Sequence, residues 1–68
     1  MPILDIDIYR TAKLLVDHHG KDAPIHAAMR ADELLAAGDI DGQRVWLKIL
    51  KATEELLGTT PAAGQMVH

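Results

Sequence analysis

The sequence predicts an all-α fold, a small three-helix domain in which an antiparallel helix hairpin is joined to one further helix. Its 68 residues suffice for one domain and not for two. Alanine, leucine and charged residues, which favour helices, dominate the composition. Apolar residues recur every three or four positions over three stretches that glycines separate. Cysteine is absent, so helix packing and self-association remain as sources of stability for so short a chain.

The first helix is predicted to run from Asp5 to His19. Gly20 follows it and can take the left-handed conformation that ends a helix. The alternation of residues 5–8 would also suit a strand, but a lone strand would have no partner in this chain. The apolar positions at helical spacing are Leu4, Ile8, Ala12, Leu15 and Val16.

The second helix is predicted from Ala23 to Ala37, with Asp22 as its N-cap and Gly38 as its stop. Alanines on its contact face would let two helix axes approach closely. Asp32 interrupts the apolar stripe, and we expect it to pair with Arg30 or with a residue on another helix.

The third helix is predicted from Ile40 to Leu57, capped by Asp39 or Asp41, with Lys51 and Glu55 as a weak surface pair. Short connections predict that consecutive helices lie antiparallel. Residues 1–58 would then form the domain. The remaining residues, 59–68, have no usable period and predict a disordered tail.

Three stretches suggest a known family: His19-Gly20-Lys21-Asp22-Ala23, Ala27-Ala28-Met29-Arg30-Ala31-Asp32, and Gly38-Asp39-Ile40-Asp41-Gly42 leading into Val45-Trp46. With them, the chain from Asp7 to Leu57 resembles a family of short, uncharacterised bacterial all-helical proteins of unknown function. The resemblance implies a compact helical protein and transfers no catalytic residue.

The charge of the chain argues against nucleic acid as its main partner. The formal net charge is −3, whereas a domain that binds phosphate usually carries a basic excess. A small DNA-associated regulator of helix-turn-helix type is the alternative function, because the last two helices loosely resemble that motif. Asp39 and Asp41 would then face phosphate at the start of the recognition helix, which opposes binding. No secretory signal or membrane span is recognisable, so we expect a cytoplasmic protein.

The sequence offers no set of residues that commits to a reaction. His18 and His19 are adjacent and would point about 100° apart on a helix, whereas His26 can approach His19 across the turn, with Asp22 nearby. That is a partial metal site at most. Serine and cysteine are absent, and no phosphate- or dinucleotide-binding motif occurs. We therefore expect no enzyme activity, no metal and no cofactor.

Apolar residues exceed what three short helices can bury, which predicts a homo-oligomer, most simply a dimer. Alternatively, the same apolar surface would bind an unknown protein partner. Trp46 would serve equally as a core residue or as an interface anchor. The residues expected at the interface are Ile8, Leu15, Trp46, Leu47, Leu50 and Leu57.

Deleting residues 59–68 should leave the thermal midpoint of unfolding nearly unchanged, because this segment lacks a pattern that would bury it. Circular dichroism on the full and shortened chains measures the difference. A large drop would mean that Met66 or Val67 docks on the helices or on a second chain.

Overall fold

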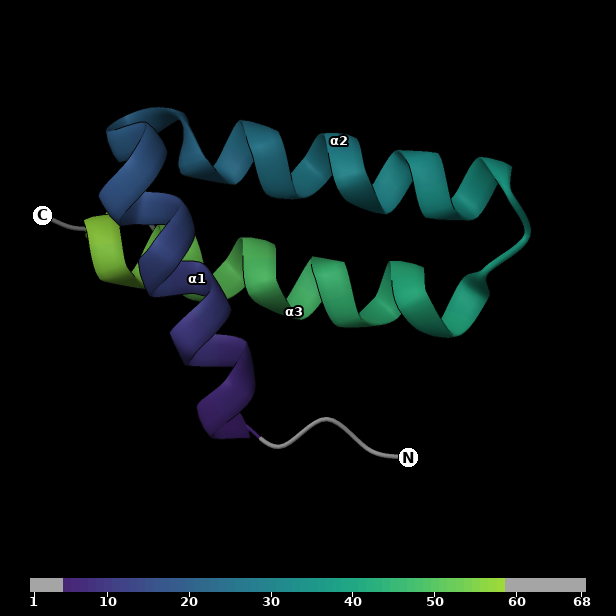
Figure 1. The fold of residues 1–68 in the computed structure, drawn as a ribbon, viewed down its shortest axis with the longest axis horizontal. Helices are drawn as coiled ribbons and strands as arrows, with labels where there is room; N and C mark the ends of the chain where they lie inside the picture. The colour runs from purple at the N-terminus through teal and green to yellow at the C-terminus, as the bar shows by residue number, and fades with distance from the viewer. Residues whose placement is uncertain (1–4, 59–68) are drawn as a thin grey trace, which may run out of the picture.

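The computed structural model describes residues 5–58 and forms a compact all-α domain, which confirms the predicted fold class. Helix α1 covers Asp5–His19, a 3-10 turn η1 covers Gly20–Asp22, α2 covers Ala23–Ala36, and α3 covers Ile40–Leu57 (Figure 1). These bounds match the predicted ones to within one residue. Leu4 and the expected disordered tail at 59–68 lie outside the described residues.

Helices α1 and α2 form one bent helical segment, because the three residues between them are themselves helical. Gly20 has the expected left-handed conformation, with φ of 57°, yet the backbone N–H of Ala23 donates to the Gly20 carbonyl and continues the spiral. The prediction that α1 and α2 lie antiparallel is therefore wrong. Figure 1 shows α1 crossing α2 and α3 steeply near one end of the molecule. Asp22 stands at the N-cap position of α2, but its side chain makes no capping hydrogen bond, since the preceding turn already supplies helical geometry.

Helices α2 and α3 form the antiparallel hairpin that the sequence predicts (Figure 1). At Gly38, φ of 83° allows its N–H to donate to the Leu35 carbonyl at 3.0 Å, and the Asp39 N–H reaches the Leu34 carbonyl at 2.8 Å. These two bonds close the end of α2. The Asp39 carboxylate then accepts from the Gly42 N–H at 2.9 Å and begins α3, as predicted. One residue thus ends one helix and starts the next.

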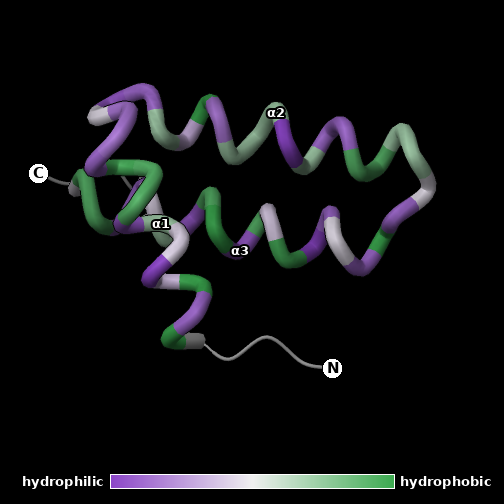
Figure 2. Tube along the Cα trace, viewed as in Figure 1, coloured by the Kyte–Doolittle hydropathy of each residue, from purple (hydrophilic) through white to green (hydrophobic). Residues whose placement is uncertain are grey.

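The core where the three helices meet is built mainly from alanine. Of the seven buried hydrophobic residues in the described part of the chain, only two are larger than alanine, which lets the helix axes approach closely. Figure 2 shows hydrophobic and hydrophilic positions alternating along α2 and α3, as amphipathic helices require. The buried hydrophobic residues are Ile8, Ala12, Ala23, Ala27, Ala31, Ile49 and Ala52.

The larger side chains of the hairpin are only partly covered by this small core. Trp46 packs against its edge and stays half-buried, as do Val45 and Leu50. Thr53 is the one fully buried polar residue among those described, and its hydroxyl donates to the Leu50 carbonyl at 2.6 Å. This hydrogen bond offsets the cost of removing the hydroxyl from water.

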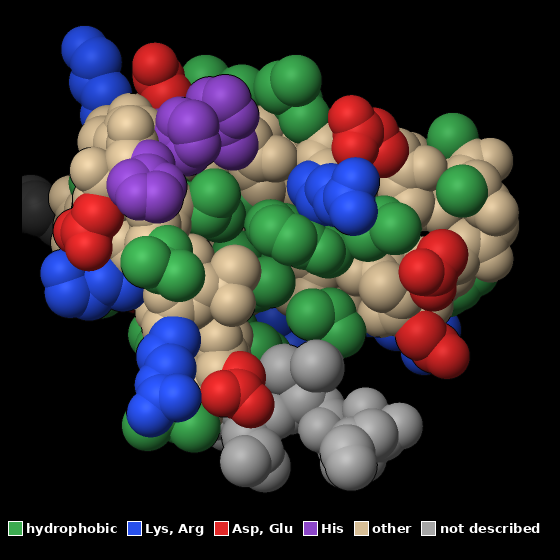
Figure 3. Space-filling model, viewed as in Figure 1, with side chains coloured by type: hydrophobic (Ala, Val, Ile, Leu, Met, Phe, Trp, Pro, Cys, Tyr) green, Lys and Arg blue, Asp and Glu red, His purple; other side chains and the backbone are tan. Residues whose placement is uncertain are grey.

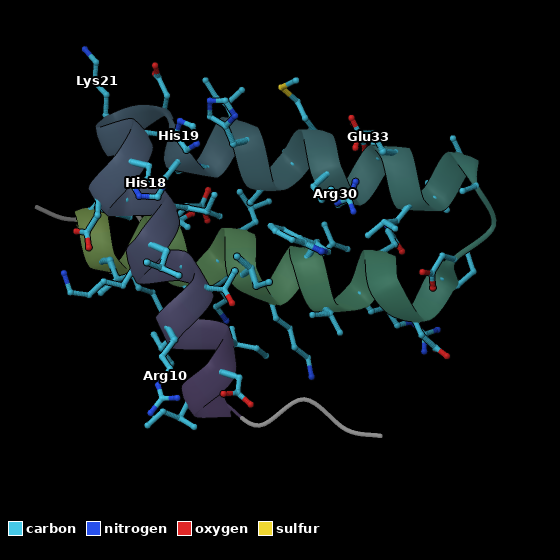
Figure 4. The ribbon with its side chains drawn as sticks, in the orientation of Figure 1. Arg10, His18, His19, Lys21, Arg30 and Glu33 are labelled. Carbon is cyan, nitrogen blue, oxygen red and sulfur yellow. The ribbon has the colours of Figure 1, made fainter. Side chains whose placement is uncertain are left out.

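The polar pairs of the surface differ from those expected. Arg30 pairs with Glu33 at 3.1 Å, while Asp32 is exposed, because its spacing from Arg30 places the two on different sides of α2. Figure 4 shows the Arg30 and Glu33 side chains beside each other on α2. Glu55 accepts a hydrogen bond from the Tyr9 hydroxyl at 2.6 Å instead of forming the predicted pair with a lysine of α3. A tertiary contact thus replaced a local one.

Replacing Ala27 with leucine should lower the free energy of unfolding by ~1–3 kcal/mol, because the added atoms have no room between the closely packed helices. Ala36→Leu, an exposed change on the same helix, is the matched control and should alter it by less than ~0.5 kcal/mol. Urea denaturation followed by circular dichroism, at one fixed chain concentration, measures both. Equal free energies of unfolding for Ala27→Leu and the natural chain would show that the contact around Ala27 has room for a larger side chain.

Candidate functional site

Helix α3 has three sides, and each meets a different environment. Its first side packs on the alanine face of α2. Its second side meets α1, where a shallow hollow is lined by Ile8 and Tyr9 of α1 and by residues of α3. The hydrogen bond from Tyr9 to Glu55 joins the two helices there. The α3 residues that line this hollow are Lys48, Lys51, Ala52 and Glu55.

The third side of α3 carries a row of residues that we call the α3 stripe. Its members are separated by three or four residues in alternation, which is the spacing of the a and d positions of a coiled coil. Ile40 and Leu47 are each 43% exposed, and the remaining four residues are half-buried. The stripe runs the full length of α3 and consists of Ile40, Gln43, Leu47, Leu50, Glu54 and Leu57.

The six residues expected at an interface divide between the core and this stripe. Ile8 is only 5% exposed and lies in the core of its own chain, and Leu15 packs against that core. Trp46 is half-buried beside the α3 stripe. Leu47, Leu50 and Leu57 are members of the stripe.

Sequence analysis missed Ile40, Gln43 and Glu54 as members of the same row. The signal that identifies them is their spacing of three or four residues from the neighbouring members of the row. A search for apolar residues alone does not find this row, because Gln43 and Glu54 are polar. Polar residues at occasional a or d positions are common in coiled coils, where they select one arrangement over others.

The three described histidines, His18, His19 and His26, gather where α1 meets α2, and Figure 3 shows this cluster on the surface. Figure 4 labels His18 and His19 there. The rings of His19 and His26 stack with centroids 3.7 Å apart and planes 20° from parallel, and His18 meets His19 edge-on at 6.4 Å. The expected approach of His26 to His19 is confirmed. Nitrogen lone pairs lie in the ring planes, so two nearly parallel rings do not converge on one ion. Within residues 5–58 no group of three or more metal-ligating side chains is found.

Neither the start of α3 nor the visible surface resembles a DNA-binding face. The Asp39 carboxylate is fixed on the first turn of α3 by its bond to Gly42, and Asp41 follows it there. Those charges stand at the end of the helix that a helix-turn-helix protein directs at bases. On the face drawn in Figure 3, acidic and basic side chains are interspersed, with no continuous basic patch.

A second hollow lies on the outer side of α1, around Ile6, Arg10 and Leu14, and it is open to solvent. Figure 4 shows Arg10 pointing away from the body of the molecule. A wide opening does not exclude water from a reacting group, so this hollow lacks the enclosure typical of an active site. None of the described helices combines the length and the apolar character needed to cross a membrane.

No protein-family model matches the chain, and no curated protein or solved structure is significantly similar to it. The resemblance to short bacterial helical proteins therefore stays a prediction.

Adding zinc or a chelator should change neither helicity nor the thermal midpoint, because the stacked histidines do not form a complete ligand set. Circular dichroism and titration calorimetry test this. Zinc binding tighter than about 1 μM that is lost in His19→Ala, and retained in an exposed control such as Lys21→Ala, would overturn it.

Proposed function

We propose that this protein is a non-enzymatic helical interaction module that associates with a second copy of itself. The observation that supports it is the third side of α3, where Ile40 and Leu47 of the α3 stripe are each 43% exposed and its leucines at positions 50 and 57 are only half-buried within the chain. Leucines at coiled-coil spacing along a whole helix are typical of a helix that packs against another helix.

The small core explains why the α3 stripe is available. Alanines fill the contacts between the helices, so most of the large aliphatic side chains of α3 find only part of their burial within the chain. Leu35 of α2, 48% exposed, adds to the apolar surface of the hairpin. Burial of apolar area contributes roughly 25 cal/mol per Å², which a short chain without disulfides can gain by association.

A second copy is the partner that fits this surface most simply. In a two-fold dimer the same surface serves both chains, so one set of side chains supplies both halves of the contact. The apolar side chains of the α3 stripe would then be removed from water together. The alternative as a DNA-associated regulator has no comparable surface in its favour, given the aspartates at the start of α3.

Sedimentation equilibrium at tens of micromolar should give about twice the chain mass of 7.4 kDa. Leu47→Asp should weaken the dimer by at least about 100-fold, because an unpaired carboxylate would be buried in the contact. Leu56→Asp is the matched control. Leu56 is 46% exposed, close to the 43% of Leu47, and lies on a different side of α3, so this variant should stay dimeric.

The melting temperature of the unmodified chain should rise with its concentration, since dissociation accompanies unfolding of an associated protein. A monomer mass together with a midpoint independent of concentration would contradict the proposal. Equal weakening by the two aspartate variants would show that the α3 stripe is not the contact.

A further inference from the structure

We infer that the outer side of α1 on one copy of the chain binds the outer side of α2 on another copy, head to tail. The outer side of each helix is the one that faces away from its buried alanines. This contact uses no residue of the α3 stripe, so it goes beyond the proposed dimer. The inference follows from two exposed apolar surfaces of opposite charge.

The outer side of α1 combines exposed apolar side chains with a guanidinium group. Ile8 and Ala12 are buried, and Arg10 lies two residues from each, about 200° around the helix. Figure 4 shows Arg10 pointing away from the body of the molecule. Ile6 and Leu14, one turn to either side of Arg10, are 58% and 57% exposed. Within residues 5–58, the Arg10 guanidinium makes no hydrogen bond or ion pair.

The outer side of α2 combines exposed apolar side chains with carboxylates. Ala27 is buried, and Ile25 and Met29 lie about 200° around the helix from it, 58% and 53% exposed. Asp22 comes three residues before this apolar pair, and Asp32 comes three residues after it. Both aspartates are exposed, and neither carboxylate forms a hydrogen bond or an ion pair in the described part of the chain. Along this side the row is acidic, apolar, apolar and acidic.

The other charges near these two sides are paired within their own helices. On α1, Lys13 binds Asp17 at 3.2 Å. On α2, Arg30 binds Glu33 at 3.1 Å. Each of these pairs is neutral, so Arg10 leaves the outer side of α1 basic, whereas the two aspartates leave the outer side of α2 acidic.

The two outer sides match in the order of their side chains. When two helices pack, side chains of one insert between side chains that are three or four residues apart on the other. In an antiparallel crossing, Leu14 fits between Ile25 and Met29 of the second copy. Arg10, one turn from Leu14, then lies beside Asp32 of the second copy. The apolar groups leave water together, and the two opposite charges meet next to them.

A second copy is the partner because the same chain carries both surfaces. Helix α1 crosses α2 steeply (Figure 1), and its inner side belongs to the core, so its outer side cannot reach α2 of its own chain. Because the two surfaces differ, each contact leaves one of each kind free, and association continues head to tail. The contact is small beside stable interfaces, which bury about 1,200–2,000 Å². We therefore expect a dissociation constant on the order of 1 mM, too weak to change the mass at tens of micromolar.

Leu47→Asp isolates this contact, because it removes the α3 contact and leaves both outer sides intact. Sedimentation equilibrium of this variant up to about 2 mM should show a mass that rises with concentration. Arg10→Glu and Asp32→Arg, each combined with Leu47→Asp, should weaken the association about fivefold, because like charges then face each other. An equal mixture of the two should recover it, since opposite charges meet again. Arg44→Glu, the same exposed charge change on α3, is the matched control and should have no effect.

A Leu47→Asp chain that stays monomeric at about 2 mM would overturn this inference and leave the proposed dimer in place. A mixture that associates no better than its two components, or an equal loss in Arg44→Glu, would also overturn it. Retention of the Leu47→Asp chain on phosphatidylserine vesicles without association between chains would assign the outer side of α1 to a lipid surface instead. Failure of the proposed dimer appears separately, as a monomer mass of the natural chain at tens of micromolar. Circular dichroism should show natural helicity in every variant, since all the altered positions are exposed.

Discussion

The alanine-lined contact among the three helices is the constraint on which the rest of the structure depends. Ala27 of α2, Ala12 of α1 and Ala52 of α3 belong to one buried cluster, and two isoleucines complete it. Small side chains let backbones approach closely, and dispersion attraction over many atoms then replaces the burial of a few large groups. The close contact also determines what is left outside, since a core this narrow has no room for Trp46 or for the leucines of α3.

The shape of the chain follows from this contact and from two differently built turns. Gly38 and Asp39 reverse the direction of the chain, because one takes a left-handed conformation and the other both closes α2 and caps α3. Gly20 also takes a left-handed conformation, but the chain there remains helical and only bends. Helix α1 is therefore directed across the hairpin instead of along it. It packs on the side of α3 that carries Ala52 and Glu55, while Ile40 and Leu47 of α3 stay exposed.

This difference explains what the sequence could and could not predict. Helix bounds were predictable because glycines and Asp39 fix them by local backbone chemistry. The direction of α1 was not, since the same glycine conformation permits either a reversal or a bend. The wrongly predicted side-chain pairs have a related cause, because they were chosen from neighbours in the sequence. Arg30 pairs with Glu33 and not with Asp32. Glu55 bonds to Tyr9, which lies 46 residues away in the sequence, and not to Lys51. Among the expected interface residues, Ile8 and Leu47 look alike in the sequence, and only the packing of α1 separates a core position from a surface one.

The polar members of the α3 stripe bear on specificity more than on stability. A row of leucines alone would let two helices pair in either direction and in several registers. A glutamine and a glutamate at half-buried positions weaken every arrangement in which they lack a complementary neighbour. The polar residues of this surface would therefore restrict the ways in which a second copy can pair with it.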